Sequence, residues 1–531
     1  MLKQTLTGFV AALALAGAAQ AQTAIPLPSP EGVRAHMTFL ADDLLEGRGT
    51  GTRGHEVAAL YVTTRLQALG VQPMGNAEGT DWRQPVAFST AKVVDGGVVW
   101  TPTRGRATTW ANGTQALMIP VVAGQSAVSG EVVFVGYGLE EDYAGLDVAG
   151  KIVLALLGAP EGVEEEGKQR AAFSRGAVGM IQINTQATEE EYDWSDLVHY
   201  LTGEQVSLRE PNAGLLPQGP QFALLDREAA AAMFAGAERS LEQVLAEAAT
   251  TGGRPKGFVL PGQATLSTNI AVGEMDSHNI VGVLPGSDPA LRGEYVVVVA
   301  HLDHEGISSD ETLPDRIYNG AMDNAMGTAA MLETARILSE QPTRPRRSVI
   351  FLAVTGEEKG LLGSDYFARN PTVAKDKLVA VVNLDMPVIL WPFSDIVVLG
   401  AENSTLGPVV EGIATGLNLT VTPDPLPEEN FFVRSDHYSF VKQGVPAVDI
   451  SPGPANGGKE ILERFLEDTY HKPNDDMSQP FDWNAVARFV QLNTAVVRAI
   501  ADADQRPLWY EGDQYGAEHA PAAPKAPRPA Q

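Results

Sequence analysis

A series of apolar runs in the second half of the chain constrains most strongly what this sequence can fold into. Segments with helical spacing separate the runs, and the alternation continues from about residue 279 to residue 505. The runs are NIVGVLPG, YVVVVA, SVIFLAVTG, LVAVVNLDM and QGVPAVDIS. Strands that are apolar along their whole length are typical of a parallel sheet with helices on both faces. We therefore predict a three-layer α/β fold with a mostly parallel central sheet.

The segment before this alternation has a different pattern. Residues 91–265 contain short β-rich runs that are separated by turn residues. Closely spaced short strands are typical of a compact β-rich unit. We predict an inserted β-rich domain over residues 91–265. Residues 22–90 then form the N-terminal part of the main domain, which resumes at residues 266–505.

Two helices are expected before the insertion, over residues 31–45 and 54–70. The second helix is expected to place Val57, Leu60, Tyr61 and Leu69 near one face. The stretch LEGRGTGTRG between the helices is rich in glycine but lacks the GxxxxGK[ST] pattern of a phosphate-binding loop. We interpret it as a structural loop.

The two ends of the sequence carry patterns of their own. Residues 1–21 combine Lys3, a short apolar stretch and an Ala-Gln-Ala site, as in a secretory signal peptide. No later run reaches the roughly 18 apolar residues of a membrane span, so no membrane anchor is expected. The Pro/Ala-rich segment 506–531 is predicted to be disordered. We expect an exported protein, in the periplasm or outside the cell.

Charge and cysteine content exclude several kinds of function. The chain has 66 acidic and 38 basic residues and a net charge of −28, which argues against nucleic acids and anionic membranes as partners. It has no cysteine, so disulfides, thiolate metal sites and a cysteine nucleophile are excluded.

Side chains that can bind metals follow the apolar runs. They are His301, Asp303, His304, Asp323, Glu357, Glu358, Asp385 and, late in the chain, His471. The carboxyl ends of parallel strands meet at one edge of a sheet, so these side chains should lie close together. Imidazole and carboxylate groups without thiolate suit zinc, with manganese and cobalt as possible substitutes. The pattern predicts a two-metal hydrolytic site.

Two of these carboxylates are neighbours in the sequence. Successive side chains of an extended stretch point in opposite directions. One of Glu357 and Glu358 can therefore bind a metal while the other faces water and substrate. The alternation alone does not decide which residue has which role.

Five motifs in a fixed order resemble metallopeptidase family twenty-eight, the co-catalytic zinc aminopeptidases of bacteria and their relatives. The motifs are HLD, NGAMDNAMG, GEEKGLLGS, NLDM and YHKPNDD, and the resemblance covers about residues 279–500. It implies the zinc-exopeptidase fold, which is phosphorylase/hydrolase-like. In the insertion, VVFVGYGLEEDYAGLDVAGKIVLALLG and RAAFSRGAVGMIQIN resemble a protease-associated domain.

The family resemblance also implies which residues bind two zinc ions. Asp323 corresponds to the carboxylate that bridges the two ions. His301 and Asp385 would complete one site, and Glu358 and His471 would complete the other.

Further roles follow from the same resemblance. Glu357 would be the general base, and Asp303 would orient His301 by accepting its second ring N–H. His437 or Tyr438 would donate a hydrogen bond to the oxyanion, and we favour His437. His304 and Arg434 are weaker candidates for contacts with the substrate.

The reading that follows is an exported aminopeptidase that hydrolyses N-terminal residues from peptides. A glutamate-carboxypeptidase-like enzyme is the main alternative, with Arg316 or Arg434 binding a substrate carboxylate. Single-zinc glutaminyl cyclases share the fold, and a receptor-like binding protein without catalysis is an alternative of another class. Segment 425–436 is a candidate wall of the pocket for the side chain at the cleaved bond. The side-chain preference, native metal and oligomeric state stay open.

Overall fold

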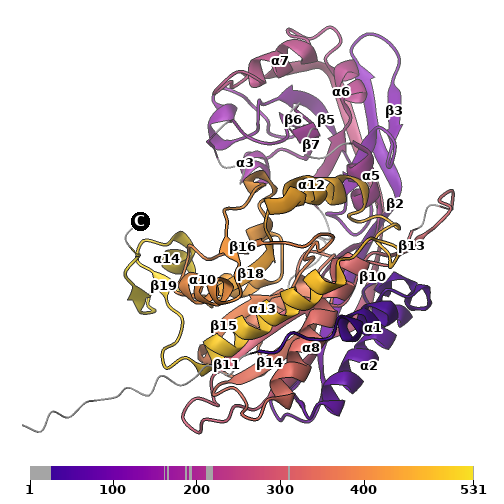
Figure 1. The fold of residues 1–531 in the computed structure, drawn as a ribbon. Coiled ribbons are helices and arrows are strands. Elements are labelled where there is room, and N and C mark those ends of the chain that lie inside the picture. Colours follow the sequence, from indigo (N-terminus) through magenta and orange to yellow (C-terminus); the bar gives the residue numbers. More distant parts are fainter. Residues whose placement is uncertain are drawn as a thin grey trace, which may run out of the picture.

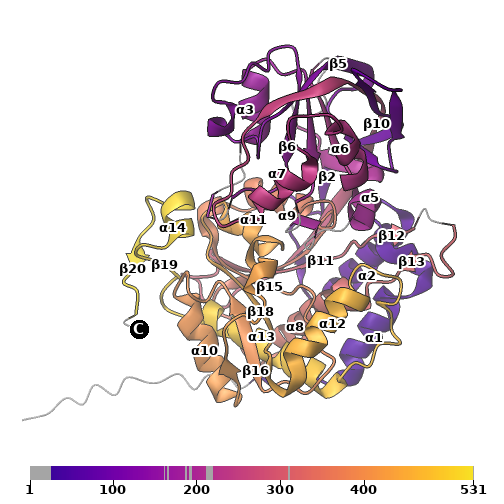
Figure 2. The ribbon, with the colours of Figure 1, turned by 90° about the horizontal axis from the view of Figure 1, so that it is seen from above.

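The computed structural model describes residues 25–160, 162–163, 167–185, 188–189, 194–210, 219–308 and 311–529. The predicted signal peptide, residues 1–21, lies outside these ranges. A larger α/β unit carries a smaller, β-rich unit on one side (Figures 1 and 2). Among the described residues, no helix has both the length and the apolar character needed to cross a membrane.

The sheet of the larger unit is parallel at its centre. β14, β11, β15 and β18 are neighbours in this order and run parallel to one another. β16 pairs antiparallel with β18, and β10 pairs antiparallel with β14. The strands are β14 (Ser348–Val354), β11 (Tyr295–His301), β15 (Leu378–Asn383), β18 (Ala447–Pro452), β16 (Asp395–Leu399), β17 (Thr420–Val421), β10 (Phe258–Leu284) and β1 (Gln72–Pro73). The predicted mostly parallel central sheet is confirmed.

Helices cover both faces of this sheet, which gives the predicted three layers (Figure 2). One face buries the larger core against α1 (Pro30–Leu40), α2 (Arg53–Ala68), α8 (Gly327–Glu340), α10 (Leu406–Gly416), α12 (Gly458–Asp468) and α13 (Trp483–Asp502). The other face packs against α9 (Leu362–Arg369) and α11 (His437–Val441). Strands buried on both faces explain why their sequences are apolar throughout.

The face that α2 buries differs in part from the predicted one. Val57 and Leu60 are 37% and 58% exposed, whereas Ala58, Val62 and Leu66 are fully buried. The helix packs against α8 and β10 through a stripe that includes small alanine side chains. Tyr61 and Leu69 do pack against the core, so the prediction was wrong for Val57 and Leu60.

The insertion has its own hydrophobic core but shares two long strands with the larger unit. β2 (Arg83–Pro102) pairs antiparallel with β10 along most of its length. The predicted boundaries of the insertion, at residues 91 and 265, therefore fall inside continuous strands. That the insertion is a protease-associated domain stays a prediction. Its other elements are β3 (Thr108–Ala111), β4 (Ala116–Ile119), β5 (Gly124–Phe134), β6 (Ile152–Leu156), α3 (Lys168–Ser174), β7 (Gly179–Ile183), α5 (Trp194–Thr202), β8 (Gln205–Leu208), β9 (Gln221–Leu225), α6 (Arg227–Met233) and α7 (Leu241–Ala248).

The prediction of a disordered C-terminal segment was wrong for residues 506–529. This stretch forms β19 (Trp509–Tyr510), α14 (Gln514–His519) and β20 (Lys525–Ala526). Trp509 is only 2% exposed, and its ring N–H donates to the carbonyl of Gly444 at 2.9 Å. Burial of this indole ring offsets part of the cost of ordering the segment.

Candidate functional site

The predicted metal ligands lie together at the carboxyl edge of the parallel strands. His301 is the last residue of β11, the two glutamates follow β14, and Asp385 follows β15. Asp323 lies in an irregular turn that leads into α8, and His471 lies in the loop after α12. The chain order and strand order therefore bring residues that are up to 170 positions apart in sequence to one edge.

The cluster has two halves that share one carboxylate. In the first half, His301 Nε2 lies 3.0 Å from Asp323 Oδ1 and 2.9 Å from Asp385 Oδ1. In the second half, His471 Nε2 lies 3.2 Å from Asp323 Oδ2 and 3.1 Å from Glu358 Oε2. Asp323 thus directs one oxygen toward each half, which is the arrangement expected of a bridging ligand.

The electrostatics of the cluster favour a bound cation. Burial alone would lower the pKa of His301, but the carboxylates of Asp385, Glu357 and Asp323 raise it well above its ordinary value. Burial would likewise lower the pKa of His471, but the Glu358 carboxylate raises it well above its ordinary value. The buried acids thus stabilise positive charge at both imidazoles. The donors include no thiolate, and the ligand atoms of His301, Asp323 and Asp385 lie within 4.8 Å of one another, so this set fits zinc. Around Glu358, the groups that lie as close join it to Asp323 and His304, and to His471 and Glu305.

Glu357 is placed to exchange protons. Desolvation raises its pKa well above the ordinary value; His301 opposes the shift, and Asp385 and Glu358 add to it. Its backbone N–H donates to Asp303 Oδ1 at 3.2 Å. A glutamate with a raised pKa suits a group that accepts a proton and later returns it.

Asp303 supports the cluster differently from the prediction. The second ring nitrogen of His301, Nδ1, donates to the backbone carbonyl of Asp303 at 3.0 Å. The Asp303 carboxylate instead accepts from the Glu357 N–H and from Thr50 Oγ1, the latter at 2.7 Å. The prediction that the Asp303 side chain orients His301 was therefore wrong. The turn after β11 places the backbone carbonyl of Asp303, rather than its carboxylate, beside the imidazole.

The Gly-rich loop between α1 and α2 is structural, as predicted. Arg48 in this loop is 1% exposed and donates to the carbonyls of Leu302 at 3.0 Å and Gly320 at 3.0 Å. Burial lowers the pKa of Arg48 to about 10, with Asp323 acting in the opposite direction, so the guanidinium stays charged at neutral pH. The loop ties the end of β11 to the turn that carries Asp323.

Asp475 is a supporting residue that the sequence reasoning missed. Its carboxylate accepts from the backbone N–H groups of Met322 at 2.9 Å and Asp323 at 3.0 Å. It lies four residues after His471, within the YHKPNDD motif. Its position in that motif is the sequence feature that could have identified it as a supporting residue. Asp475 thus links the loop of His471 to the turn of Asp323.

Two of the weaker candidates lie within or beside the cluster. His304 Nδ1 is 2.6 Å from Glu358 Oε1, so this imidazole contacts a predicted ligand directly. His437 is fully buried next to Asn383, and burial lowers its pKa to about 4. His437 Nε2 has no hydrogen-bond partner among the described residues, and the neutral ring can carry its proton on that nitrogen.

The other candidates make the contacts described below with residues outside the cluster. Tyr438 packs edge-on against Tyr515 of the C-terminal segment. Arg434 donates to the Glu429 carboxylate at 3.1 Å, and Arg316 donates to the carbonyl of Ser308 at 2.8 Å.

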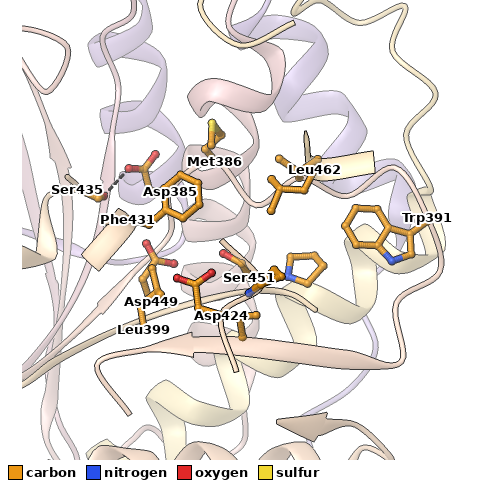
Figure 3. A pocket seen from close by; sticks show the side chains of 14 residues that line it. Asp385, Met386, Trp391, Leu399, Asp424, Phe431, Ser435, Asp449, Ser451 and Leu462 are labelled. Atoms are coloured by element: carbon orange, nitrogen blue, oxygen red, sulfur yellow. Dashed lines mark hydrogen bonds between the residues drawn. The ribbon is translucent and has the colours of Figure 1, made fainter. Parts of the chain in front are cut away.

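A mostly apolar pocket opens beside Asp385 (Figure 3). Ser435 donates to the Asp385 oxygen that points away from His301, which connects the pocket to the cluster. Phe431, from segment 425–436, lies in the pocket wall. That this segment lines the pocket for the side chain at the cleaved bond stays a prediction. The labelled lining residues are Asp385, Met386, Trp391, Leu399, Asp424, Phe431, Ser435, Asp449, Ser451 and Leu462.

Comparison with protein families identifies the segment that carries the cluster. The sequence model of Peptidase family M28 matches residues 279–497. This segment contains all five predicted ligands and Glu357.

Individual proteins match parts of the chain. It is 36% identical over 107 residues to a probable zinc metalloprotease of Pyrenophora tritici-repentis, across 20% of this chain and 23% of that protein. It is 28% identical over 197 residues to Aminopeptidase Y of Saccharomyces cerevisiae, across 35% of this chain and 34% of the relative. The chain thus spans about a quarter to a third of the length of these relatives. Among solved structures, an aminopeptidase from Aneurinibacillus sp. strain AM-1 superposes with a TM-score of 0.58 at 20% identity, across 88% of this chain and 93% of the other. This likeness shows that the two proteins share a fold that includes the insertion.

Proposed function

We propose, on the premise that residues 279–497 form a domain of peptidase family M28, that this protein is a zinc-dependent aminopeptidase. The observation that carries the proposal is the shared carboxylate: one oxygen of Asp323 faces His301 and the other faces His471. Two zinc ions would be held by His301, Asp323 and Asp385 on one side and by Asp323, Glu358 and His471 on the other. Bound there, they would supply Lewis acidity and lower the pKa of water.

The protein's own residues then handle protons and orientation. Glu357 accepts a proton from the attacking water and returns it to the amine that leaves, which matches its raised pKa. Asp303 holds Glu357 in place through the backbone N–H of that residue. His437 is proposed to donate from Nε2 to the developing oxyanion. The pocket beside Asp385 would receive the side chain at the cleaved bond.

The contacts of the two arginines favour an aminopeptidase over a carboxypeptidase. Recognition of a C-terminal carboxylate needs an available cation, and Arg316 and Arg434 are both engaged by other acceptors. A substrate ammonium group suits the acidic surroundings of Glu357 and Glu358. The complete set of ligands and the base disfavours a non-catalytic receptor. Export through residues 1–21, to the periplasm or the medium, is part of this proposal.

A substrate comparison tests the proposal. Mature protein is assayed with aminoacyl-p-nitroanilides and with N-blocked dipeptides, before and after chelation, and again after zinc is restored. Cleavage of free-amine substrates that chelation abolishes and zinc restores is the expected result. Cleavage of N-blocked substrates alone would overturn the aminopeptidase assignment. Glu357→Gln serves as the inactive control that should still bind zinc.

A further inference from the structure

One side chain of the insertion reaches the metal cluster. Tyr200, in α5, places its hydroxyl oxygen 2.9 Å from Nδ1 of His471. The two rings meet edge to face with centroids 6.3 Å apart. Tyr200 is 43% exposed, so its ring lies at the boundary between the cluster and solvent.

His471 needs a partner that orients it. The residue has a positive φ of 52°, a backbone conformation that residues other than glycine adopt infrequently. It lies in a loop rather than in a helix or strand. Its Nε2 faces Asp323 and Glu358. If Nε2 binds a metal, Nδ1 carries the ring proton, and this N–H donates a hydrogen bond to the Tyr200 hydroxyl. The hydrogen bond to Tyr200 then restrains the orientation of the ring.

The corresponding partner in the first half comes from the larger unit itself. His301 Nδ1 donates to the carbonyl of Asp303, two residues along the same strand end. The orienting contact of His471 instead comes from a residue 271 positions away, in a unit with a separate hydrophobic core. The two halves therefore differ in their dependence on the insertion.

Contacts within the insertion hold Tyr200 in place. Trp194, at the start of α5, donates its ring N–H to the carbonyl of Thr114 at 2.7 Å. The side chain of Gln205 donates to the carbonyl of Tyr200 at 2.9 Å, and Gln205 pairs in turn with Ala91 of β2. Since β2 continues toward the central sheet, α5 is connected to the larger unit through this long strand.

We propose that Tyr200 is a positioning residue for His471, through which the insertion completes the second half of the metal centre. The inference rests on the proposed function for the identity of the metal, but not for the hydrogen bond. A displacement of the insertion would remove the orienting contact of His471 and leave the ligands of the first half unchanged.

Zinc affinity measured by competition with a chromophoric chelator tests the inference on the full mature chain. In Tyr200→Phe, we expect one of two bound zinc ions to be held about 10- to 100-fold more weakly, because the loss of an orienting partner has effects of this size. The other ion should keep its affinity. The melting temperature of the zinc-free variant should not change, because the side chain is half-exposed and only its hydroxyl is removed.

Tyr137→Phe is the matched control. Its hydroxyl donates to the carbonyl of Ala248 within the insertion, so the change removes a tyrosine hydroxyl from the same unit without touching His471. Equal affinity of the wild type and Tyr200→Phe for both ions would overturn the inference and leave the proposed function intact. A wild-type chain that binds fewer than two zinc ions would overturn the two-zinc assignment, and the inference with it.

Discussion

The two halves of the cluster are built in different ways. His301 and Asp385 stand at the ends of neighbouring parallel strands, and backbone pairing sets their spacing. His471 lies in a loop, and its position depends on Asp475 within that loop and on Tyr200 of the insertion. The first half therefore belongs to the rigid centre of the fold. The second half is held by segments that are distant in sequence. Changes in those segments can therefore affect it.

Replacement of the shared ligand should affect both halves. Asp323→Asn removes the charge that both imidazoles face, so we expect neither zinc ion to bind tightly and activity to fall by at least about 10³-fold. Elemental analysis of the dialysed variant, together with its rate on an aminoacyl-p-nitroanilide, measures this. Two tightly held zinc ions in Asp323→Asn would contradict the bridging role.

Loss of the base should leave both halves intact. In Glu357→Gln the donors are unchanged, so we expect two zinc ions to remain while kcat falls about 10²- to 10⁴-fold, the usual contribution of a positioned proton acceptor. Zinc content and kcat are measured on the same preparation. A variant that retains most of the wild-type rate would assign the proton transfer to another group.

A change beneath the first half should have a smaller effect. Thr50→Val removes the hydroxyl that donates to buried Asp303, and leaving such an acceptor unpaired costs about 1–3 kcal/mol. We expect a lower unfolding free energy and a reduced kcat, because Asp303 also holds the Glu357 backbone. Denaturant unfolding and steady-state kinetics measure the two effects. Thr64→Val, at an exposed site on α2, is the control and should change neither.

A change far from both halves should alter stability alone. Burial raises the pKa of Glu333, but hydrogen bonds from His36 and Arg336 lower it to about 2, from an ordinary value of 4.5. A carboxylate with a lowered pKa stabilises the fold above pH 4.5, and its contribution is lost as the pH falls toward 2. Glu333→Gln should thus cost about 1–2 kcal/mol at pH 7, after allowance for screening by solvent.

Unfolding of this variant and the wild type, followed between pH 7 and pH 2, tests the sign. The difference in unfolding free energy should shrink as the pH falls, while zinc affinity at pH 7 stays at the wild-type value. A difference that stays constant with pH would show that the carboxylate charge does not contribute.

The strand-borne part of this architecture could be predicted from the sequence because its signals are local. An apolar run predicts a buried strand, and a polar side chain at its end predicts a donor at the sheet edge, as for His301 and Asp385. The ligand assignment of His471 needed the family resemblance, because nothing in its polar loop indicates which residues it contacts. Thr50 and Tyr200 lie 253 and 271 positions from their partners at the cluster, Asp303 and His471, and no periodicity connects them.

The errors have equally physical causes. Composition indicated disorder for the C-terminal segment, yet it forms regular elements that bury Trp509 and Tyr510. Hydrophobicity selected Val57 and Leu60 for the buried face of α2, yet close packing favoured its alanines. The Asp303 role was assigned by analogy to a side chain, whereas the backbone carbonyl makes the contact. The first two errors depended on tertiary contacts that the local sequence does not encode, whereas the third concerns a local contact between residues two positions apart.

Anomalous diffraction at the zinc edge, on crystals of the mature chain grown with zinc, tests the central claim most directly. The account predicts two strong peaks at one edge of the sheet. One should be bound by His301, Asp323 and Asp385, and the other by Asp323, Glu358 and His471. A single peak that lacks Asp323 as a ligand, or peaks away from these residues, would contradict it.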